Sequence, residues 1–361
     1  MENLVSSDFW RGRRVFLTGH TGFKGSWLAL WLSELGAHVS GFSLAAETPS
    51  LFEQAGIETR VTHVEGDIRD LAAVEAAMAQ SDPEVVFHLA AQPLVRRSYE
   101  NPVETYATNV QGTVHVLDAC RRMAGLKAVV CVTSDKCYEN REWIWPYREN
   151  DPMGGYDPYS SSKGAAELVI AAYRRSFFQS GAGIASVRAG NVIGGGDWAE
   201  DRLIPDIVRA LIAGQRPMIR SPESIRPWQH VLEALGGYLL IAAHLVEGRE
   251  TTAKGWNFGP NDDDARPVSW IVEKMLDGWG GAGWDRSPGE HPHEAKILKL
   301  DCSAARSELG WRPAFSLETA LRQIVEWHQA VDGGSDARAV SLNQLSEYRE
   351  AFARALSGKA A

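Results

Sequence analysis

Early in the chain the sequence reads Arg14-Val15-Phe16-Leu17-Thr18-Gly19-His20-Thr21-Gly22-Phe23-Lys24-Gly25. The apolar run 14–18 predicts a buried strand, and the run Lys24–Leu35, closed by Gly36, predicts a helix. Glycines at 19, 22 and 25 permit a tight turn, a close approach of backbone N–H groups to a pyrophosphate, and tight packing of helix on strand. We therefore expect the first unit of a dinucleotide-binding fold; a glycine turn with a purely structural role is the alternative.

The alternation of strand and helix continues to about residue 190. Two long stretches predict helices over Pro102–Met123 and Tyr159–Phe178. This rhythm is typical of βαβ units, so the fold class we predict is α/β: a Rossmann-type doubly wound parallel sheet with a smaller, mixed C-terminal substrate-binding lobe. Further strands are predicted at residues 37–42, 61–64, 84–89, 128–132 and 184–188.

The texture of the sequence changes after Asn191, where Gly194-Gly195-Gly196-Asp197 forms a predicted loop and connections rich in Pro and Gly follow. We therefore divide the chain into an NAD-binding domain over 8–190 and a mainly substrate-binding lobe over 191–361. Residues of about 223–258 are expected to return to the first domain. The polar stretch from Asp332 predicts a loosely attached helix over Ser346–Leu356.

Composition excludes several classes of function. The 361 residues carry a formal net charge of −9, which argues against a nucleic-acid partner. The chain lacks both the run of about 18 apolar residues that a membrane span needs and the pattern of a secretion signal. Its four cysteines are too few and too scattered for a disulfide frame. We expect a cytoplasmic protein, not bound to membranes, with reduced and packed cysteines.

The end of the second predicted strand, Ser40-Gly41-Phe42-Ser43, lacks the acidic residue that usually binds the ribose hydroxyls. It also lacks a basic residue for a 2'-phosphate, so NAD is the expected cofactor, held with modest affinity and with Ser43 as a weak hydrogen-bond partner. Asp67 and Ile68 follow the third predicted strand and are candidates to contact adenine. A simple Asp-containing turn is the alternative for them.

Tyr159 and Lys163 lie four residues apart at the start of a predicted helix, so both side chains emerge on one face. A phenol is a poor base at neutral pH, and a neighbouring ammonium group lowers its pKa. The pair therefore predicts acid–base chemistry, although such spacing also arises by chance. Ser134, Asp135 and Lys136 end another predicted strand, where ligands of parallel sheets bind.

These motifs together resemble those of the extended short-chain dehydrogenases over nearly the whole chain. The shared features are T-G-x-x-G-F-x-G at Thr18–Gly25, His88-Leu89-Ala90-Ala91, Asn109 and Y-x-x-x-K at Tyr159–Lys163. Within that family, the chain resembles the branch that dehydrates the nucleotide sugar CDP-glucose. The stretches that carry this closer resemblance are Thr18–Trp27, Thr133–Tyr138, Gly194–Trp198, Arg226–Val231 and His293–Ala295.

The resemblance implies NAD bound near Gly19, Thr21, Gly22, Phe23, Lys24, Gly25, Ser43, Asp67, Ile68, Ala90, Ala91, Asn109, Tyr159 and Lys163. It implies a lyase of deoxysugar and O-antigen biosynthesis that oxidises C4 of the hexose, eliminates water across C5 and C6, and returns the hydride to C6. Tyr159 then takes the C4 hydroxyl proton, Lys163 tunes Tyr159 and holds the nicotinamide ribose, and Ser134 bonds the C4 oxygen.

Asp135 and Lys136 are the residues that point to dehydration. Many nucleotide-sugar dehydratases have Thr-Asp-Glu where this chain has Ser134, Asp135 and Lys136. A neutral Lys136 would take the C5 proton, which desolvation and the charge of Lys163 favour because both lower the pKa of a lysine. A protonated Asp135 would donate its proton to the C6 hydroxyl, which leaves as water. A structural ion pair between Lys136 and Asp135 is the alternative.

A nucleotide diphosphate needs locally gathered polar and cationic side chains in an acidic protein. Arg202 and Arg226 are the candidate cations, Asn191 resembles the family's diphosphate-binding asparagine, and Gln92 is a candidate for the sugar pocket; each is alternatively a surface or turn residue. No metal is expected, because His291-Pro292-His293-Glu294 has poor ligand geometry.

Three other functions remain open on the residues alone. A different nucleotide-sugar 4,6-dehydratase or a 4-epimerase would share the glycine turn, Tyr159 and Lys163, and a non-catalytic NAD-sensing regulator would share the fold.

In the resembled family, two long helices of each subunit pack into a four-helix bundle. Pro102–Met123 and Tyr159–Phe178 would supply them here, so we expect a homodimer or a homotetramer built on dimers.

Overall fold

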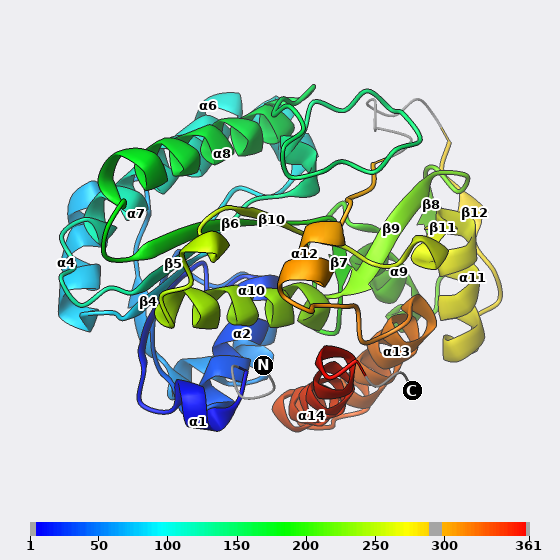
Figure 1. The fold of residues 1–361 in the computed structure, drawn as a ribbon. Coiled ribbons are helices and arrows are strands. Elements are labelled where there is room, and N and C mark those ends of the chain that lie inside the picture. Colours follow the sequence, from blue (N-terminus) through cyan, green and yellow to red (C-terminus); the bar gives the residue numbers. More distant parts are fainter. Residues whose placement is uncertain (1–4, 289–297, 359–361) are drawn as a thin grey trace.

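The computed structural model describes residues 5–288 and 298–358, and its centre is a parallel sheet (Figure 1). Within those residues the sheet has seven strands in the order β10-β6-β5-β4-β1-β2-β3, and every neighbouring pair is parallel. The predicted α/β class is therefore confirmed. The strands are β1 (Arg14–Thr18), β2 (His38–Ser43), β3 (Thr62–Glu65), β4 (Val85–His88), β5 (Ala128–Val132), β6 (Gly183–Ala189) and β10 (Gly255–Phe258).

Helices cover both faces of this sheet, as expected for a doubly wound fold. On one face of the sheet, above it and to its left in Figure 1, lie α4 (Leu71–Ser81), α7 (Gly112–Cys120) and α8 (Pro158–Phe177), which share one apolar core with strand side chains. Below it lie α2 (Phe23–Glu34) and α10 (Val231–Val246), with a second, larger core. The shorter helices of this part are α1 (Ser7–Trp10), α3 (Leu51–Gln54) and α5 (Val95–Glu100).

The predicted helix Pro102–Met123 is not one regular helix. It consists of α6 (Pro102–Tyr106), a π-helical turn over Ala107–Gln111, and α7, which ends at Cys120. Such π-turns insert one residue into a helix and frequently occur at functional sites. This one contains Asn109, whose side chain is buried.

The lobe has its own small sheets and its own apolar core. β7 (Asn191–Ile193), β9 (Ile225–His230) and β11 (Ala265–Pro267) form one sheet in the order β11-β9-β7, and β8 (Met218–Ile219) pairs with β12 (Asp285–Arg286). The core lies among α9 (Leu203–Ile212), α11 (Val268–Trp279) and α13 (Leu317–Asp332). Because α10 packs on the large sheet and β10 is one of its strands, the lobe is not continuous in sequence. The proposed division of the chain at residue 190 stays a prediction.

The C-terminal helix is longer and more firmly packed than the sequence predicted. α14 spans Ala337–Leu356, with Leu345, Tyr348 and Phe352 buried in the core that also contains α2 and α10. These side chains recur every three or four residues, which is the period of one helix face. A helix does cover Ser346–Leu356, but the expectation that it is loosely attached was wrong. The polar residues between the buried side chains make the apolar face hard to recognise in the sequence. α12 (Ser303–Glu308) precedes the two last helices.

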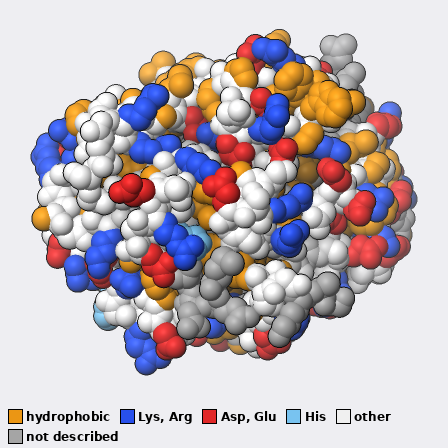
Figure 2. All heavy atoms as spheres, in the orientation of Figure 1, with side chains coloured by type: hydrophobic (Ala, Val, Ile, Leu, Met, Phe, Trp, Pro, Cys, Tyr) orange, Lys and Arg blue, Asp and Glu red, His pale blue; other side chains and the backbone are white. Residues whose placement is uncertain are grey.

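The exposed surface and the cysteines agree with an ordinary globular protein. Lys and Arg side chains alternate with Asp and Glu over the face shown in Figure 2, so neither sign of charge dominates it. All four cysteines are free and buried, as predicted. No helix in the described part of the chain is both long and apolar enough to cross a membrane.

Glu233 is a buried carboxyl group that ties α10 to the C-terminal region. It accepts hydrogen bonds from the backbone N–H groups of Ala314 (3.0 Å) and Phe315 (2.7 Å) and from the Tyr348 hydroxyl (3.2 Å). Burial nevertheless raises the pKa of Glu233 from 4.5 to about 7. The folded protein therefore binds a proton here more tightly than the unfolded chain does.

We predict that Glu233→Gln removes a pH dependence of folding stability. A carboxyl group whose pKa is raised on folding contributes stability below the unfolded pKa, and this contribution is lost as pH rises from about 4.5 to 7. The free energy of unfolding of the wild type should fall by roughly 2–3 kcal/mol across that window because of this group, and that of the variant should not. Urea unfolding at pH 5 and pH 7.5 measures both. Exposed Glu318→Gln is the control, and parallel wild-type and Glu233→Gln profiles would contradict the prediction.

Candidate active site

The glycine turn connects the end of β1 to the start of α2 and lies against the residues that follow β4. Gly19 has a left-handed φ of +78°, and a Cβ atom there would lie 2.7 Å from the backbone nitrogen of Ala90. A Cβ atom on Gly25 would lie 2.0 Å from the Gly19 carbonyl oxygen. Gly19 and Gly25 therefore have no room for a side chain, as the predicted tight turn and tight helix packing require. The Ala90-Ala91 segment lies against this turn.

The N-terminus of α2 fits the pyrophosphate of a dinucleotide. Gly22 precedes the helix, is exposed, and supplies no side-chain cap, so the first backbone N–H groups of α2 keep their capacity for a ligand. A Cβ atom on Gly22 would meet nothing closer than 3.4 Å within the protein. The close approach that Gly22 permits is therefore directed outward.

A hydroxyl pair stands where most dinucleotide sites have a carboxylate. The Thr21 hydroxyl donates to the Leu44 carbonyl (3.0 Å), so the Ser43 hydroxyl, 2.7 Å away, donates to Thr21. Ser43 keeps its acceptor lone pairs for a ribose hydroxyl. This arrangement fits the weak ribose contact that the sequence predicted.

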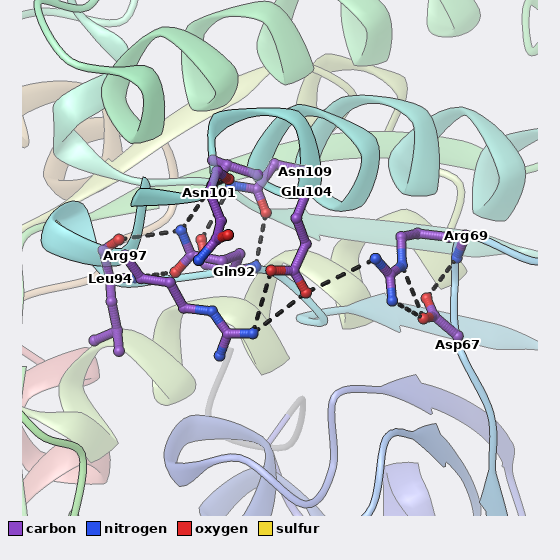
Figure 3. Close-up of polar contacts among 9 residues, drawn as sticks. Asp67, Arg69, Gln92, Leu94, Arg97, Asn101, Glu104 and Asn109 are labelled. Atoms are coloured by element: carbon purple, nitrogen blue, oxygen red, sulfur yellow. Dashed lines mark hydrogen bonds and ion pairs between the residues drawn. The ribbon is translucent and has the colours of Figure 1, made fainter. Parts of the chain in front are cut away.

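The Asp67 carboxylate is already occupied by a neighbour. One of its oxygens accepts the backbone N–H of Arg69 (2.8 Å), and the other accepts the Arg69 guanidinium (2.5 and 2.8 Å). Hydrogen bonding from Arg69 holds the pKa of Asp67 below its ordinary value. Glu104 continues the ion pairs from Arg69 to Arg97 across the surface (Figure 3). Ile68 is buried beside Gly112.

Asn109 and Gln92 form a buried amide network beside the cofactor turn (Figure 3). Asn109 bonds both backbone groups of Gln92, accepting from its N–H (2.8 Å) and donating to its carbonyl (3.1 Å). The Gln92 side chain donates to the Leu94 carbonyl and to the Thr105 hydroxyl and accepts the Leu94 N–H. Since these bonds direct its amide into the protein, contact of Gln92 with substrate stays a prediction.

Tyr159 and Lys163 are both buried on the face of α8 that meets the end of β5. Asp157 caps this helix by accepting the N–H of Ser160 (2.9 Å). The Lys163 ammonium donates to the Val132 carbonyl (3.4 Å), and burial lowers the pKa of Lys163 to about 8. Burial raises the pKa of Tyr159 to about 12 against an opposing hydrogen bond with Ser134. The predicted lowering of that pKa is not found, because desolvation outweighs the nearby cations.

Ser134, Asp135 and Lys136 form the tight turn that follows β5. The Ser134 hydroxyl donates to Asp135 (3.0 Å) and accepts the N–H of Lys136 (3.2 Å). Asp135 is buried against the Cα atom of Gly190, where a Cβ atom would lie 2.9 Å from its carboxylate. Burial raises the pKa of Asp135. Burial therefore favours the protonated form of Asp135 that proton donation requires, and the role of Asp135 as the acid stays a prediction.

Cations surround this turn. Lys24 has its pKa lowered to about 7 by burial, by Arg202 and by Lys163, while Asp135 opposes that shift. Arg202, directly before α9, bonds the Asp197 carboxylate (3.1 and 3.3 Å) and acts electrostatically on Tyr159. The structure therefore brings Lys24 and Arg202 to the catalytic groups, although the overall charge of the protein is negative.

The other two predicted diphosphate ligands lie in the small sheet of the lobe. Asn191 begins β7 and stands in register with Trp228 of β9, and Arg226 lies on β9 opposite Arg266 of β11. Both predicted residues are half-buried. Neither position alone identifies a ligand, so their roles remain predictions.

The sequence analysis missed a buried ion pair at the site. Glu167 of α8 and Arg188 of β6 are joined at 2.8 Å, with 3% and 5% of their side chains exposed. The available signal was spacing: Glu167 follows Lys163 as Lys163 follows Tyr159, by four residues, so all three lie on one helix face. Arg188 comes from a distant segment, and nothing local in the sequence pairs it with Glu167.

Within residues 5–288 and 298–358 we find no group of three His, Cys, Asp or Glu side chains that could hold a metal ion. The sequence His291-Pro292-His293-Glu294, and with it the His293–Ala295 stretch of the family resemblance, lies outside the described residues.

Comparison with known proteins places this site in a family. A curated CDP-glucose 4,6-dehydratase of Salmonella typhimurium is 55% identical over 359 residues, covering 97% of this chain and 100% of that relative. A dTDP-glucose 4,6-dehydratase of Streptomyces antibioticus is 30% identical and covers 74% of this chain and 76% of its own. The solved dTDP-glucose 4,6-dehydratase of Streptomyces venezuelae, with NAD and TYD bound, has the same fold: its TM-score is 0.78 at 24% identity, covering 90% of this chain and 99% of its own.

The family model described as GDP-mannose 4,6 dehydratase matches residues 16–324. That range runs from β1 into α13 and includes the glycine turn, the turn after β5 and the Tyr159–Lys163 pair. The resemblance that the motifs predicted is thereby confirmed. The chain belongs to the GDP-mannose 4,6-dehydratase family of extended short-chain dehydrogenases.

Proposed function

We propose that this protein is an NAD-dependent lyase that converts CDP-glucose into CDP-4-dehydro-6-deoxy-glucose and water. The observation that carries the proposal is 55% identity over nearly the whole chain to a CDP-glucose 4,6-dehydratase. The turn Ser134–Lys136 supports it independently, because it carries a lysine next to the buried Asp135 carboxyl, which in turn interacts with Tyr159. A product of this kind belongs to deoxysugar biosynthesis.

The glycine turn and the segments around it carry residues that fit the cofactor. The start of α2 after Gly22 would hold the pyrophosphate, Ser43 the adenosine ribose, Asp67 and Ile68 the adenine edge, and Lys163 the nicotinamide ribose. When bound there, NAD would supply a hydride acceptor for the oxidation of C4 and a hydride donor to C6. The groups of the protein have to move protons in step with these transfers.

Tyr159 takes the proton of the C4 hydroxyl while Ser134, which hydrogen bonds Tyr159, holds the C4 oxygen. Arg202 acts to lower the pKa of Tyr159, and Lys163 lies one helical turn away on α8. Both cations are proposed to favour the phenolate. Burial alone keeps the Tyr159 hydroxyl protonated, so charge near the ring is required before it can act as a base.

The C4 ketone acidifies the C5 hydrogen, and the turn after β5 then completes the elimination. Lys136 takes the C5 proton and gives it back to C5 when hydride reaches C6. Asp135 gives its proton to the C6 hydroxyl, which leaves as water, and the proton that Tyr159 took from the C4 hydroxyl balances the one that Asp135 lost. The raised pKa of Asp135 supports its part, because a protonated carboxyl group is the form that can donate.

Three residues are proposed to bind the diphosphate: Arg202 and Arg226 as cations and Asn191 as an amide donor. Arg202 is oriented by Asp197 on the lobe side of the catalytic turn. Gln92 is proposed to shape the sugar pocket through its backbone loop, since its side chain bonds Leu94 and Thr105.

We also propose a homodimer, or a homotetramer built on dimers, that forms through α6, α7 and α8, and a cytoplasmic location. Large apolar side chains are exposed on α6 and α8: Val103 by 82%, Tyr106 by 39% and Leu168 by 63%. Exposed apolar side chains on these helices support an interaction surface there. The four free cysteines support a reducing compartment.

The rival functions fit the site less well. A 4-epimerase needs no acid–base couple for C5 and C6, so it leaves Asp135 and Lys136 without a task. A regulator that only senses NAD has no use for the buried Tyr159–Lys163 pair. Another nucleotide in the substrate is the closest alternative, since curated relatives that act on dTDP-glucose share about 30% identity or less.

We predict that the purified protein with NAD removes one water from CDP-glucose, and does so much faster than from the UDP, dTDP or GDP analogue. Mass spectrometry of the nucleotide sugar measures the loss. Tyr159→Phe should abolish it, because the phenol is the base of the first step. Equal turnover of the other nucleotide sugars, or isomerisation at C4 without loss of water, would reject the proposed substrate or reaction.

We predict that Lys136→Met blocks elimination but not oxidation at C4. Loss of a positioned base typically costs about 10²–10⁴-fold in rate, so water loss should fall by at least about a hundredfold while NADH absorbance and C4 ketone accumulate. Lys127→Met is the matched control, since Lys127 lies just before the opposite end of β5 and pairs with Glu84. An unchanged rate of product formation in Lys136→Met would refute the role of Lys136.

We predict that Leu168→Glu yields a monomer. A carboxylate on the exposed face of α8 would be buried without a partner in a four-helix bundle. Sedimentation velocity measures the mass, and Ile212→Glu, at a partly exposed position on α9, should leave it unchanged. An undiminished mass for Leu168→Glu would place the interface elsewhere.

A further inference from the structure

The ion pair of Glu167 and Arg188 lies directly behind the catalytic turn. The guanidinium approaches the carboxylate with two nitrogens: Nε to Oε1 and Nη2 to Oε2, both at 2.8 Å. Both groups are buried, and such bidentate contacts fix orientation as well as distance. Burial opposes the charge of Glu167, but Arg188 outweighs it and holds the pKa of that carboxyl below its ordinary value.

The pair holds the catalytic turn at both of its ends. The hydroxyl of Thr133, the residue before Ser134, donates to Glu167 Oε1 (2.5 Å). The hydroxyl of Tyr138, the second residue after Lys136, accepts a hydrogen bond from Arg188 Nη1 (2.6 Å). The segment that contains Ser134, Asp135 and Lys136 is therefore bracketed by two hydrogen bonds to one salt bridge.

Further contacts fix the pair to the scaffold. Ser186 of β6 donates to Glu167 Oε2 (2.7 Å), so each carboxylate oxygen accepts two hydrogen bonds. Arg188 also donates to the Glu149 carbonyl (3.0 Å), and the Tyr138 hydroxyl donates to Asn257 of β10 (2.7 Å). Movement of either end of the turn would therefore break a bond to a buried charged group.

Tyr159 is held in a different way. Its position follows from the start of α8, where Asp157 caps the helix and the Ser98 hydroxyl accepts the Tyr159 backbone N–H (3.1 Å). The backbone of Tyr159 and the two ends of the turn thus have different hydrogen-bond partners, while the Tyr159 hydroxyl still contacts the turn through Ser134. A change in the bracket should affect the two steps unequally.

We propose that Glu167 and Arg188 are positioning residues for water elimination, which hold Asp135 and Lys136 against C6 and C5 by fixing Thr133 and Tyr138. This inference rests on the proposed dehydratase function and adds to it a division of labour within the site. Neither member of the ion pair touches the substrate. Their effect passes through the geometry of the turn, and small misplacements of catalytic groups are costly.

Tyr138→Phe tests the bracket with little risk to the fold. It removes one hydroxyl but keeps the ring, which stacks on Tyr147 with centroids 5.3 Å apart, and it leaves the ion pair in place. In a single turnover of CDP-glucose the rate of water loss should fall about tenfold, as misplacement of this kind permits. The rate of C4 oxidation should change less than about twofold, so NADH accumulates transiently, and the KM for CDP-glucose should not move.

Two companion variants make the result specific. Thr133→Val removes the bond at the other end of the turn and should produce the same unequal loss. Tyr147→Phe is the matched control, because its hydroxyl accepts the Arg141 N–H (2.6 Å) and donates to Asn140 (3.1 Å), away from the ion pair. It should retain both wild-type rates.

The outcomes separate this inference from the proposed function. If the wild type removes no water from CDP-glucose, the proposed function fails. If the wild type is active but Tyr138→Phe and Thr133→Val behave as Tyr147→Phe does, or slow oxidation and elimination equally, the inference is overturned. Melting curves of the three variants confirm that folded protein is compared, and a lower melting temperature with wild-type rates would also overturn it.

Discussion

One face of α8 packs against the end of β5, and the proposed chemistry of the protein depends on that contact. Tyr159, Lys163 and Glu167 follow one another at four-residue intervals, so a single helix presents a phenol, an ammonium and a carboxylate to the strand. Lys163 reaches the Val132 carbonyl and Glu167 reaches Thr133. The turn that follows can therefore place its catalytic groups beside Tyr159, although they come from a different βα unit.

Burial separates the roles of groups that would otherwise be alike. Desolvation raises the pKa of Asp135 and of Tyr159 and lowers that of Lys163 and Lys24, so each moves toward its neutral form. Glu167 moves the other way because Arg188 shares its burial. The pKa values of Lys163 and Lys24 thus lie near neutrality and that of Asp135 is raised, whereas Glu167 and Arg188 form a buried ion pair, and the proposed catalytic and positioning roles rest on that difference.

The sequence predicted what is local and missed what is not. The glycine turn, the strand alternation and the Tyr159–Lys163 spacing each lie within a short segment, so their geometry follows from strand and helix periods. Arg188 reaches Glu167 only because β5 and β6 are neighbours, which no local pattern records. The π-turn at Asn109 and the inward side chain of Gln92 arise from tertiary contacts in the same way.

The two ends of the cofactor site are built differently, and this bears on how the cofactor is held. At the adenosine end Ser43 offers only a hydroxyl, and the Asp67 carboxylate already accepts three hydrogen bonds from Arg69. At the nicotinamide end Lys163 is buried and fixed by the strand it contacts. Neither Ser43 nor Asp67 thus offers a free carboxylate to the ribose at the adenosine end, which is the physical basis for the modest NAD affinity that the sequence predicts.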